Sequence, residues 1–240
     1  GEKATWEAEL DEWTHELDDF SIDMIKEAID EEGNWLHPRQ VLRELEKAMP
    51  PRVMVSTDIG NINSVANSYL RFEEPRSFFA AMSWGNCGYA LPTIIGAKAA
   101  APDRPAVSYA GDGAWAMSMV EVMTAVRHDI PVTAIVFHNR QWGAEKKNQI
   151  DFYGDRFVGV DLPDNPDYAK VAEAMGAKGY TVDDYRDVQD VVREAMASGE
   201  PCVINAVVEG GEKVLAEPFR RDALAMPTRH LAKYAHLSLD

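Results

Sequence analysis

The sequence predicts an α/β fold, a three-layer α/β/α sandwich built on an open, mostly parallel β-sheet. Two observations predict it. Several apolar runs are continuous and rich in β-branched residues, which is typical of strands buried on both faces. Segments with a helical spacing of apolar residues separate these runs, so strands and helices alternate along the chain. The length of 240 residues suits one large domain with appendages, at roughly 150 residues per domain.

The elements follow one another in a regular order. The first helix begins at Pro38, a residue suited to the first helical turn, and Val41, Leu42 and Leu45 form its apolar face. The expected strands are Arg52–Thr57, Ala106–Ala110, Pro131–Phe137 and Pro201–Val208. The expected helices are Pro38–Met49, Tyr89–Ala101, Met117–His128, Tyr168–Met175 and Val188–Met196.

Charge and periodicity divide the chain into three parts. Residues 1–36 are expected to form an acidic linker helix region, because the first 32 residues hold 13 acidic side chains and two lysines. Four apolar residues recur there at helical spacing, which fits a linker helix or, alternatively, a specific interaction module. These are Trp6, Leu10, Trp13 and Leu17. Residues 37–208 contain the α/β domain, and residues 209–240, without a clear period, are expected to wrap the surface as a tail.

The composition argues against several classes of protein. A net charge of −16 disfavours binding to nucleic acids or anionic membranes, which require a basic surface. The sequence contains no apolar run of about 18 residues and its first residues lack the features of a signal peptide. Cys87 and Cys202 are too few for a disulfide framework or a four-ligand zinc site. We therefore expect a cytoplasmic protein.

The sharpest chemical signal is Gly111-Asp112-Gly113, directly after the expected strand 106–110. Glycines on both sides of the aspartate allow a tight turn and bring backbone N–H groups close to an anion. The next helix would add its positive N-terminal end. Because Asp112 would repel a phosphate group, a cation is expected between them, and Mg2+ prefers oxygen ligands. Since the tripeptide alone is common in surface turns, its context decides the interpretation.

A second oxygen donor supplies that context. Asn139 follows the strand 131–137 and lies 27 residues after Asp112. One crossover helix fits between the two strands, so their carboxyl ends are expected to be neighbours. The chain then leaves the sheet, which allows the carbonyl of Gln141 to supply a third oxygen. The glycine turn 57–61 ends another strand and suits the far side of a bound diphosphate.

Gly111-Asp112-Gly113 followed by Asn139 resembles the signature of thiamine-diphosphate-dependent enzymes. The segment 88–97 is also similar to a segment of the acetolactate synthase group. The resemblance covers the pyrophosphate-binding domain of these enzymes, and it implies thiamine diphosphate and Mg2+ as cofactors. It implies metal ligation by Asp112, Asn139 and Gln141. The cofactor contacts that it implies are Ile59, Gly60, Asn61, Ile62, Gly85, Cys87, Gly111, Asp112, Gly113, Ala114, Asn139 and Gln141.

Two positions depart from the family pattern. Cys87 occupies the position where methionine, leucine or isoleucine usually props the cofactor in a bent shape. A cysteine is smaller, although a buried thiol packs as a small hydrophobe. Asn61 and Ile62 replace a Gln-His pair beside the diphosphate.

Three further segments, residues 83–90, 141–153 and 218–224, are similar to the family of sulfoacetaldehyde acetyltransferases. This family converts sulfoacetaldehyde and phosphate into acetyl phosphate and sulfite. The protein's part is to bind, bend and electrostatically tune the cofactor, which carries the carbon chemistry. Because both substrates are anions, the resemblance favours cations near the site. The candidates are Lys146, Lys147, Arg220 and Arg221, and a surface charge or ion pair is the alternative for each lysine.

The activating glutamate of the family lies on a separate pyrimidine-binding domain that precedes this one. The sequence is therefore expected to be a fragment of a longer chain or one subunit of a split enzyme, without turnover of its own. Family sites lie between two subunits, which implies a homo-oligomer. Alternatives are an acetolactate-synthase-like carboligase, a 2-keto acid decarboxylase, or a non-catalytic cofactor-binding fragment. Lack of a Gly-x-Gly-x-x-Gly or Walker lysine motif disfavours nucleotide-binding modules.

Overall fold

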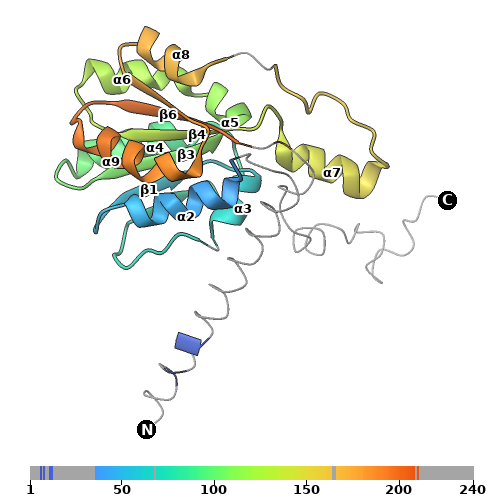
Figure 1. Cartoon of the computed structure of the whole chain (residues 1–240), viewed down its shortest axis with the longest axis horizontal. Helices are drawn as coiled ribbons and strands as arrows, with labels where there is room; N and C mark the ends of the chain where they lie inside the picture. The colour runs from blue at the N-terminus through green and yellow to red at the C-terminus, as the bar shows by residue number, and fades with distance from the viewer. Residues whose placement is uncertain are drawn as a thin grey trace.

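The structure is a computed structural model, which describes residues 36–67, 69–163, 166–208 and 210, together with residues 6, 8, 11 and 12. In these parts of the chain, six parallel strands form one sheet with helices on both faces (Figure 1). The strand order is β2-β1-β3-β4-β6-β5. The strands are β1 (Met54–Thr57), β2 (Phe78–Ala80), β3 (Ala106–Gly111), β4 (Thr133–His138), β5 (Lys178–Val182) and β6 (Cys202–Val207).

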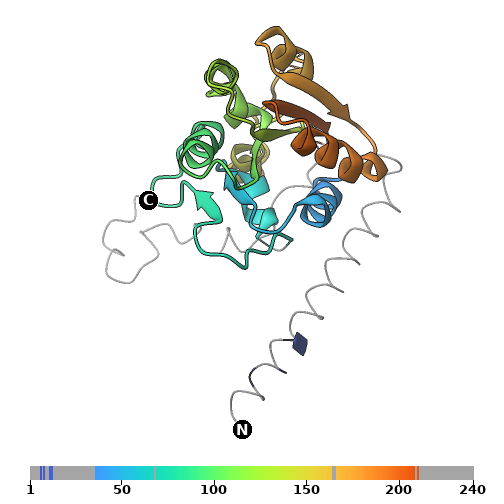
Figure 2. The same cartoon turned by 90° about the vertical axis from the view of Figure 1, so that its left-hand side faces the viewer.

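The helices divide between the two faces of the sheet. In Figure 2, α2 (Pro38–Ala48) and α9 (Val188–Ala197) lie on the opposite side of the strands from α4 (Ala90–Ala100) and α6 (Val122–Arg127). The remaining described α-helices are α3 (Asn61–Ala66), α5 (Asp112–Ala116), α7 (Gly143–Tyr153) and α8 (Tyr168–Ala174). Helix α7 stands away from the sheet and buries none of its residues (Figure 1).

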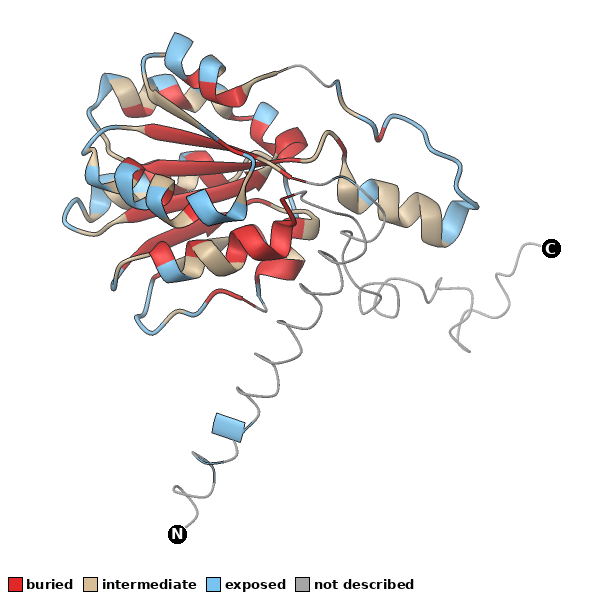
Figure 3. Cartoon of the chain, viewed as in Figure 1, coloured by how far each residue is buried: buried red, intermediate tan, exposed pale blue. Residues whose placement is uncertain are grey.

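The sheet separates two apolar cores because successive side chains of a strand point to opposite faces. In β4, Ile135 and Phe137 join the core that contains Leu42 of α2 and Val192 of α9. The alternate residues of β4, Ala134 and Val136, join the core that contains residues of α4 and α8. All six residues of β4 are therefore buried, and Figure 3 shows the central strands as a continuous buried layer.

The predicted fold class is confirmed. All four predicted strands, and four of the five predicted helices, agree with the observed bounds to within two residues. The structure adds β2, β5 and α7, which the sequence analysis did not predict as elements. Both added strands lie at edges of the sheet, where strands are short and partly polar.

The prediction of one helix over Met117–His128 is wrong. Helical structure begins earlier, at Asp112, and α5 is followed by a 3-10 turn over Met119–Glu121 and then by α6. The break falls at Ser118, whose φ of −133° and ψ of 5° lie outside the helical region. The chain therefore turns into a short helix directly after β3, which keeps Asp112 at the end of that strand.

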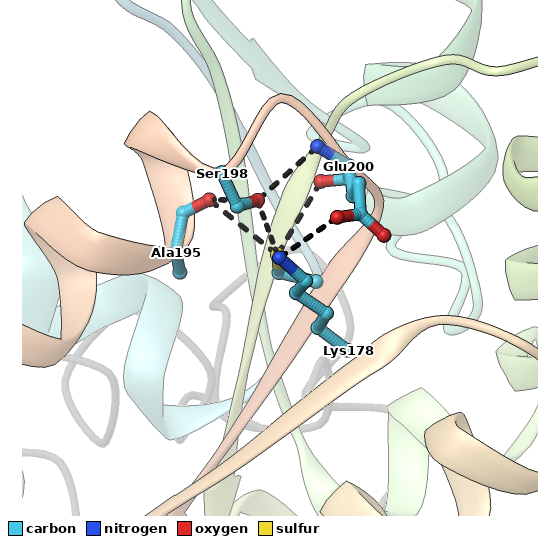
Figure 4. A network of polar contacts seen from close by, with 5 residues as sticks. Lys178, Ala195, Ser198 and Glu200 are labelled. Atoms are coloured by element: carbon cyan, nitrogen blue, oxygen red, sulfur yellow. Dashed lines mark hydrogen bonds and ion pairs between the residues drawn. The ribbon is translucent and has the colours of Figure 1, made fainter.

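Polar contacts close the turn between α9 and β6, at the end of the sheet where β5 and β6 begin (Figure 4). The Ser198 hydroxyl donates to the Ala195 carbonyl at 2.8 Å and accepts from the Glu200 N–H at 3.1 Å. Lys178 of β5 forms an ion pair with Glu200 at 2.8 Å. These contacts hold the starts of β5 and β6 together.

The predicted linker and tail fall largely outside the described residues. Of the expected apolar stripe, the structure describes Trp6, which is helical and exposed, while Leu10, Trp13 and Leu17 lie outside. Of the tail, only Gly210 is described. The domain boundaries stay predictions. Among the described residues, no helix has the length and apolar character needed to cross a membrane.

Candidate cofactor and metal site

A pocket of about 330 Å³ lies at the carboxyl ends of β1, β3 and β4. Ligands of parallel sheets bind at this edge. Eleven of the twelve residues expected to contact the cofactor line the pocket, and the twelfth, Asp112, lies between two of them in the sequence. The eleven are Ile59, Gly60, Asn61, Ile62, Gly85, Cys87, Gly111, Gly113, Ala114, Asn139 and Gln141. The structure thus gathers them in one place, and their contacts with a cofactor stay a prediction.

Asp112 connects the ends of two adjacent strands. Strands β3 and β4 pair in parallel, with Gly111 opposite Phe137, so the predicted neighbourhood of their carboxyl ends is confirmed. Asp112 is only 1% exposed. Its Oδ1 accepts the Gly113 N–H at 2.9 Å, and its Oδ2 accepts the Arg140 N–H at 2.6 Å. Each carboxylate oxygen keeps a further lone pair for a cation.

Burial makes the charged form of Asp112 unfavourable. Desolvation raises the pKa of this carboxyl to about 6, although hydrogen bonds from the Arg140 and Gly113 N–H groups act in the opposite direction. A divalent cation at the carboxylate would offset the desolvation and favour the ionised form. The electrostatics of Asp112 therefore fit a metal ligand.

The backbone of Gln141 is oriented for a third ligand. Gln141 pairs with Asp161 in an isolated antiparallel bridge, flanked by hydrogen bonds from the Trp142 N–H to Val160 and from the Leu162 N–H to Arg140. In this arrangement Gln141 and Asp161 form a non-hydrogen-bonded pair, so the Gln141 carbonyl points away from Asp161. Its side chain is 4% exposed and its Nε2 has no hydrogen-bond partner in the described structure. A buried amide of this kind requires a polar partner.

Two glycines leave room beside the candidate metal ligands. A Cβ on Gly111 would meet no atom within 4 Å, and the same holds for Gly60, whose φ is +140°. Both glycines line the pocket, so their open positions allow a ligand to approach the backbone. Both polar atoms of the Asn61 side chain are buried without a partner at the same turn. The residues present fit a diphosphate held by a divalent cation.

Gly113 has a different role from Gly111. A Cβ on Gly113 would lie 2.8 Å from two atoms of the Trp142 indole ring. The second glycine of the tripeptide therefore serves close packing, and it allows the chain after β4 to approach the start of α5.

Asp58 is a structurally important residue to which the sequence analysis gave no role. Its carboxylate is 1% exposed and accepts the N–H groups of Ile59, Gly88 and Ala90 at 3.0–3.1 Å. Burial nevertheless raises its pKa. Asp58 holds the turn after β1 against the start of α4, which positions the two pocket walls formed by residues 59–62 and 85–87.

Cys87 is half-buried and lines the pocket. Burial and the negative charges of Asp58 and Glu145 raise its pKa. Gly85, two residues earlier, has a φ of +66°, which favours glycine. Among the described residues, Cys87 and Glu145 are the two ionisable side chains that line the pocket.

Of the candidate substrate-binding cations, the structure describes the lysines, and neither Lys146 nor Lys147 lines the pocket. The Lys146 ammonium lies 2.8 Å from Asp161 Oδ1 and over the ring of Phe157, and Lys146 does not line the pocket. Arg220 and Arg221 lie outside the described residues.

Several pocket residues were missed by the sequence analysis as individual candidates. Trp84, Trp142 and Glu145 line the pocket, and all three belong to segments that carry the resemblance. Their membership of these segments was the one indication of a role that the sequence offered. They do not directly follow a predicted strand, so the strand pattern did not predict that they line the pocket.

Comparison with known proteins identifies the family of this domain. Residues 58–206 match the family described as "Thiamine pyrophosphate enzyme, C-terminal TPP binding domain". The chain is 68% identical over 234 residues to a sulfoacetaldehyde acetyltransferase of Castellaniella defragrans, covering 97% of this chain and 39% of that protein. It is 39% identical over 229 residues to the sulfoacetaldehyde acetyltransferase of Rhodobacter capsulatus, covering 94% of this chain and 38% of that protein.

More distant relatives have other activities in their names. The chain is 32% identical over 196 residues to a pyruvate oxidase of Lactiplantibacillus plantarum, covering 81% of this chain and 32% of that protein. Among solved structures, a thiamine diphosphate-dependent 4-hydroxybenzoylformate decarboxylase of Rhodococcus jostii superimposes with a TM-score of 0.71 at 24% identity, over 75% of this chain and 34% of that one. This likeness concerns the fold. The chain spans less than two fifths of the length of these relatives.

Proposed function

Because the chain belongs to the thiamine pyrophosphate enzymes, whose C-terminal cofactor-binding domain it contains, we propose that it forms the diphosphate side of the active site of a sulfoacetaldehyde acetyltransferase. The observation that carries this proposal is the 68% identity to an acetyltransferase of that name over 97% of the chain. The reaction converts sulfoacetaldehyde and phosphate into acetyl phosphate and sulfite.

The chain's part in the reaction is to hold the cofactor. Asp112, Asn139 and the Gln141 carbonyl would bind Mg2+, and the turn 59–62 would contact the diphosphate. Support comes from the buried Asp112 carboxylate and from the orphaned amide groups of Asn61 and Gln141. When bound, thiamine diphosphate supplies a carbon nucleophile and an electron sink.

Cys87 and Gly85 would hold the organic part of the cofactor. Both line the pocket, where Gly85 lies beside Ile59. The thiol of Cys87 would support the bent cofactor by packing, since its raised pKa keeps it neutral.

The remaining parts of the site would come from outside the described residues. We propose that a pyrimidine-binding domain, in the same polypeptide or in another subunit, supplies the activating glutamate, and that the intact protein is a cytoplasmic homo-oligomer. One of the tail arginines, Arg220 or Arg221, is proposed to bind a phosphate or sulfonate group, because Arg suits bidentate oxyanion binding. Arg220→Ala and Arg221→Ala test this, and unchanged KM values for both anions reject it.

The test of the proposed function uses the full-length protein that contains this sequence. Sulfite release from sulfoacetaldehyde that depends on phosphate, Mg2+ and thiamine diphosphate supports the proposal. Release of CO2 from a 2-keto acid, without sulfite release from sulfoacetaldehyde, contradicts it and favours the decarboxylase or carboligase alternative. The 240-residue chain alone is expected to show weak cofactor binding in calorimetry and no turnover, and acetyl phosphate formation by it would contradict the need for a second domain.

A further inference from the structure

The first turn of α7 brings a carboxylate to the pocket. Glu145 is the third residue of this helix and lines the pocket together with Trp142, Gly143 and Ala144. Cys87 lines the same pocket, and the negative charge of Glu145 is one of the causes that raise the pKa of its thiol. The rest of the described pocket wall consists of glycine, apolar residues and the amides of Asn61, Asn139 and Gln141.

The proposed reaction, on which this inference rests, requires two proton movements at adjacent carbons. The C–S bond of sulfoacetaldehyde breaks, and its electron pair leaves with sulfite. The aldehyde carbon loses its hydrogen as a proton and forms a bond to a phosphate oxygen. The methylene carbon gains a proton and becomes the methyl group of acetyl phosphate. An acid–base group within hydrogen-bond reach of both carbons would accelerate these transfers.

We propose that the carboxyl group of Glu145 is the acid–base catalyst that removes a proton from one substrate carbon and delivers a proton to the other. The carboxylate and the carboxylic acid alternate in this role, so Glu145 returns to its starting state after each turnover.

Among the described residues, the other acidic groups near the pocket are less suited to this task. The Asp58 and Asp112 carboxylates are each 1% exposed and are held by backbone N–H groups. The Cys87 thiol has a raised pKa. Glu145 is exposed, and its Oε2 accepts a long hydrogen bond of 3.4 Å from Asn148 Nδ2. A weakly held carboxylate at the pocket can exchange protons with substrate and solvent.

The test compares Glu145→Gln, Glu145→Asp and Glu145→Ala in the full-length protein with the wild type. We expect Glu145→Gln to lower kcat by about 100-fold or more, the usual effect of removing an acid–base group. Cofactor affinity, measured from the fluorescence of the pocket residues Trp84 and Trp142, should stay unchanged. Glu145→Asp should retain part of the activity, and formate should restore part of the activity of Glu145→Ala. Asp190→Asn is the control, because this α9 side chain is 90% exposed.

The outcomes separate this inference from the proposed function. A wild-type protein that releases no sulfite rejects the proposed function and this role with it. If the wild type turns over and Glu145→Gln turns over equally fast, only the role of Glu145 is rejected. A variant that loses cofactor affinity together with turnover, and does not respond to formate, assigns Glu145 a structural role and likewise overturns the inference.

Discussion

The backbone N–H of Arg140 donates a hydrogen bond of 2.6 Å to Oδ2 of Asp112, across 28 positions of the sequence. Arg140 lies between Asn139 and Gln141 and has a φ of +61°, a left-handed conformation that is uncommon for a residue other than glycine. This conformation directs the N–H of Arg140 to the carboxylate. The ends of β3 and β4 are thereby joined at the position where the family resemblance expects a metal ion.

Removal of the Asp112 charge should separate cofactor binding from stability. In Asp112→Asn, the loss of a buried charge favours folding. The new amide NH2, however, replaces one of the two oxygens that accept backbone hydrogen bonds, so that one backbone N–H group then faces another donor. We expect these effects to offset each other to within about 2 kcal/mol in urea unfolding, and calorimetry should detect no Mg2+-dependent binding of thiamine diphosphate. Asp190→Asn serves as the control, and cofactor binding by Asp112→Asn at wild-type affinity contradicts the metal site.

Mg2+ should stabilise the chain more at higher pH. The pKa of Asp112 is raised to about 6 in the folded state, so its contribution to stability falls as pH rises from about 4 through about 6. A cation that binds the carboxylate reverses this loss. The increase in Tm on adding Mg2+ with thiamine diphosphate should therefore be larger at pH 7.5 than at pH 5, and it should be absent in Asp112→Asn. An equal increase at both pH values speaks against a role for Asp112.

The two glycines beside Asp112 should respond differently to a methyl group. Gly113→Ala places a Cβ 2.8 Å from the Trp142 ring, so the ring or the backbone must move. The expected cost is about 1–3 kcal/mol in the free energy of unfolding. Gly111→Ala has open space and a φ of −69°, so it should change stability little while lowering cofactor affinity. Equal stability of the two variants in urea unfolding contradicts the assigned packing role.

His37 should make the α/β domain less stable in acid. Its Nδ1 accepts the Arg39 N–H at the start of α2, and burial, with the charge of Arg39, lowers its pKa to about 4. The unfolded chain binds a proton near pH 6.5, so the contribution of neutral His37 is complete above that pH and is lost as pH falls towards 4.

The measurement is urea unfolding at pH 7 and pH 5 for the wild type and His37→Asn. Asparagine also caps helices but does not titrate. Relative to the variant, the wild type should lose roughly 2 kcal/mol between these pH values. The same pH dependence in both proteins means that other groups cause the acid sensitivity.

Thiol labelling should report occupation of the pocket. Cys87 is half-buried in the pocket wall, whereas Cys202 of β6 is 1% exposed and contacts Ser198 at the end of α9. Alkylation of Cys87, followed by mass spectrometry, should be slow because its pKa is raised, and Mg2+ with thiamine diphosphate should slow it further. Cys202 should remain unlabelled in both conditions and serves as an internal control. Labelling of Cys87 at an equal rate with and without the cofactor argues against its contact with the cofactor.

The sequence by itself determined the fold class and the position of the candidate metal ligands. Continuous apolar strands such as β4 need cover on both faces, and residues that follow parallel strands must meet at one edge of the sheet. The sequence alone therefore predicts that Asp112 and Asn139 lie near one another. Local patterns were sufficient because both residues directly follow strongly apolar strands.

Only the tertiary structure decided which further side chains reach the pocket. Glu145 and Trp142 arrive there because the bridge between Gln141 and Asp161 sets the direction of α7, while the adjacent Lys146 turns to Asp161 instead. The edge strand β5, with its mixed pattern, was recognisable only through its pairing with β6. These features depend on contacts between segments that are far apart in the sequence, so the periodicity within any one segment does not encode them.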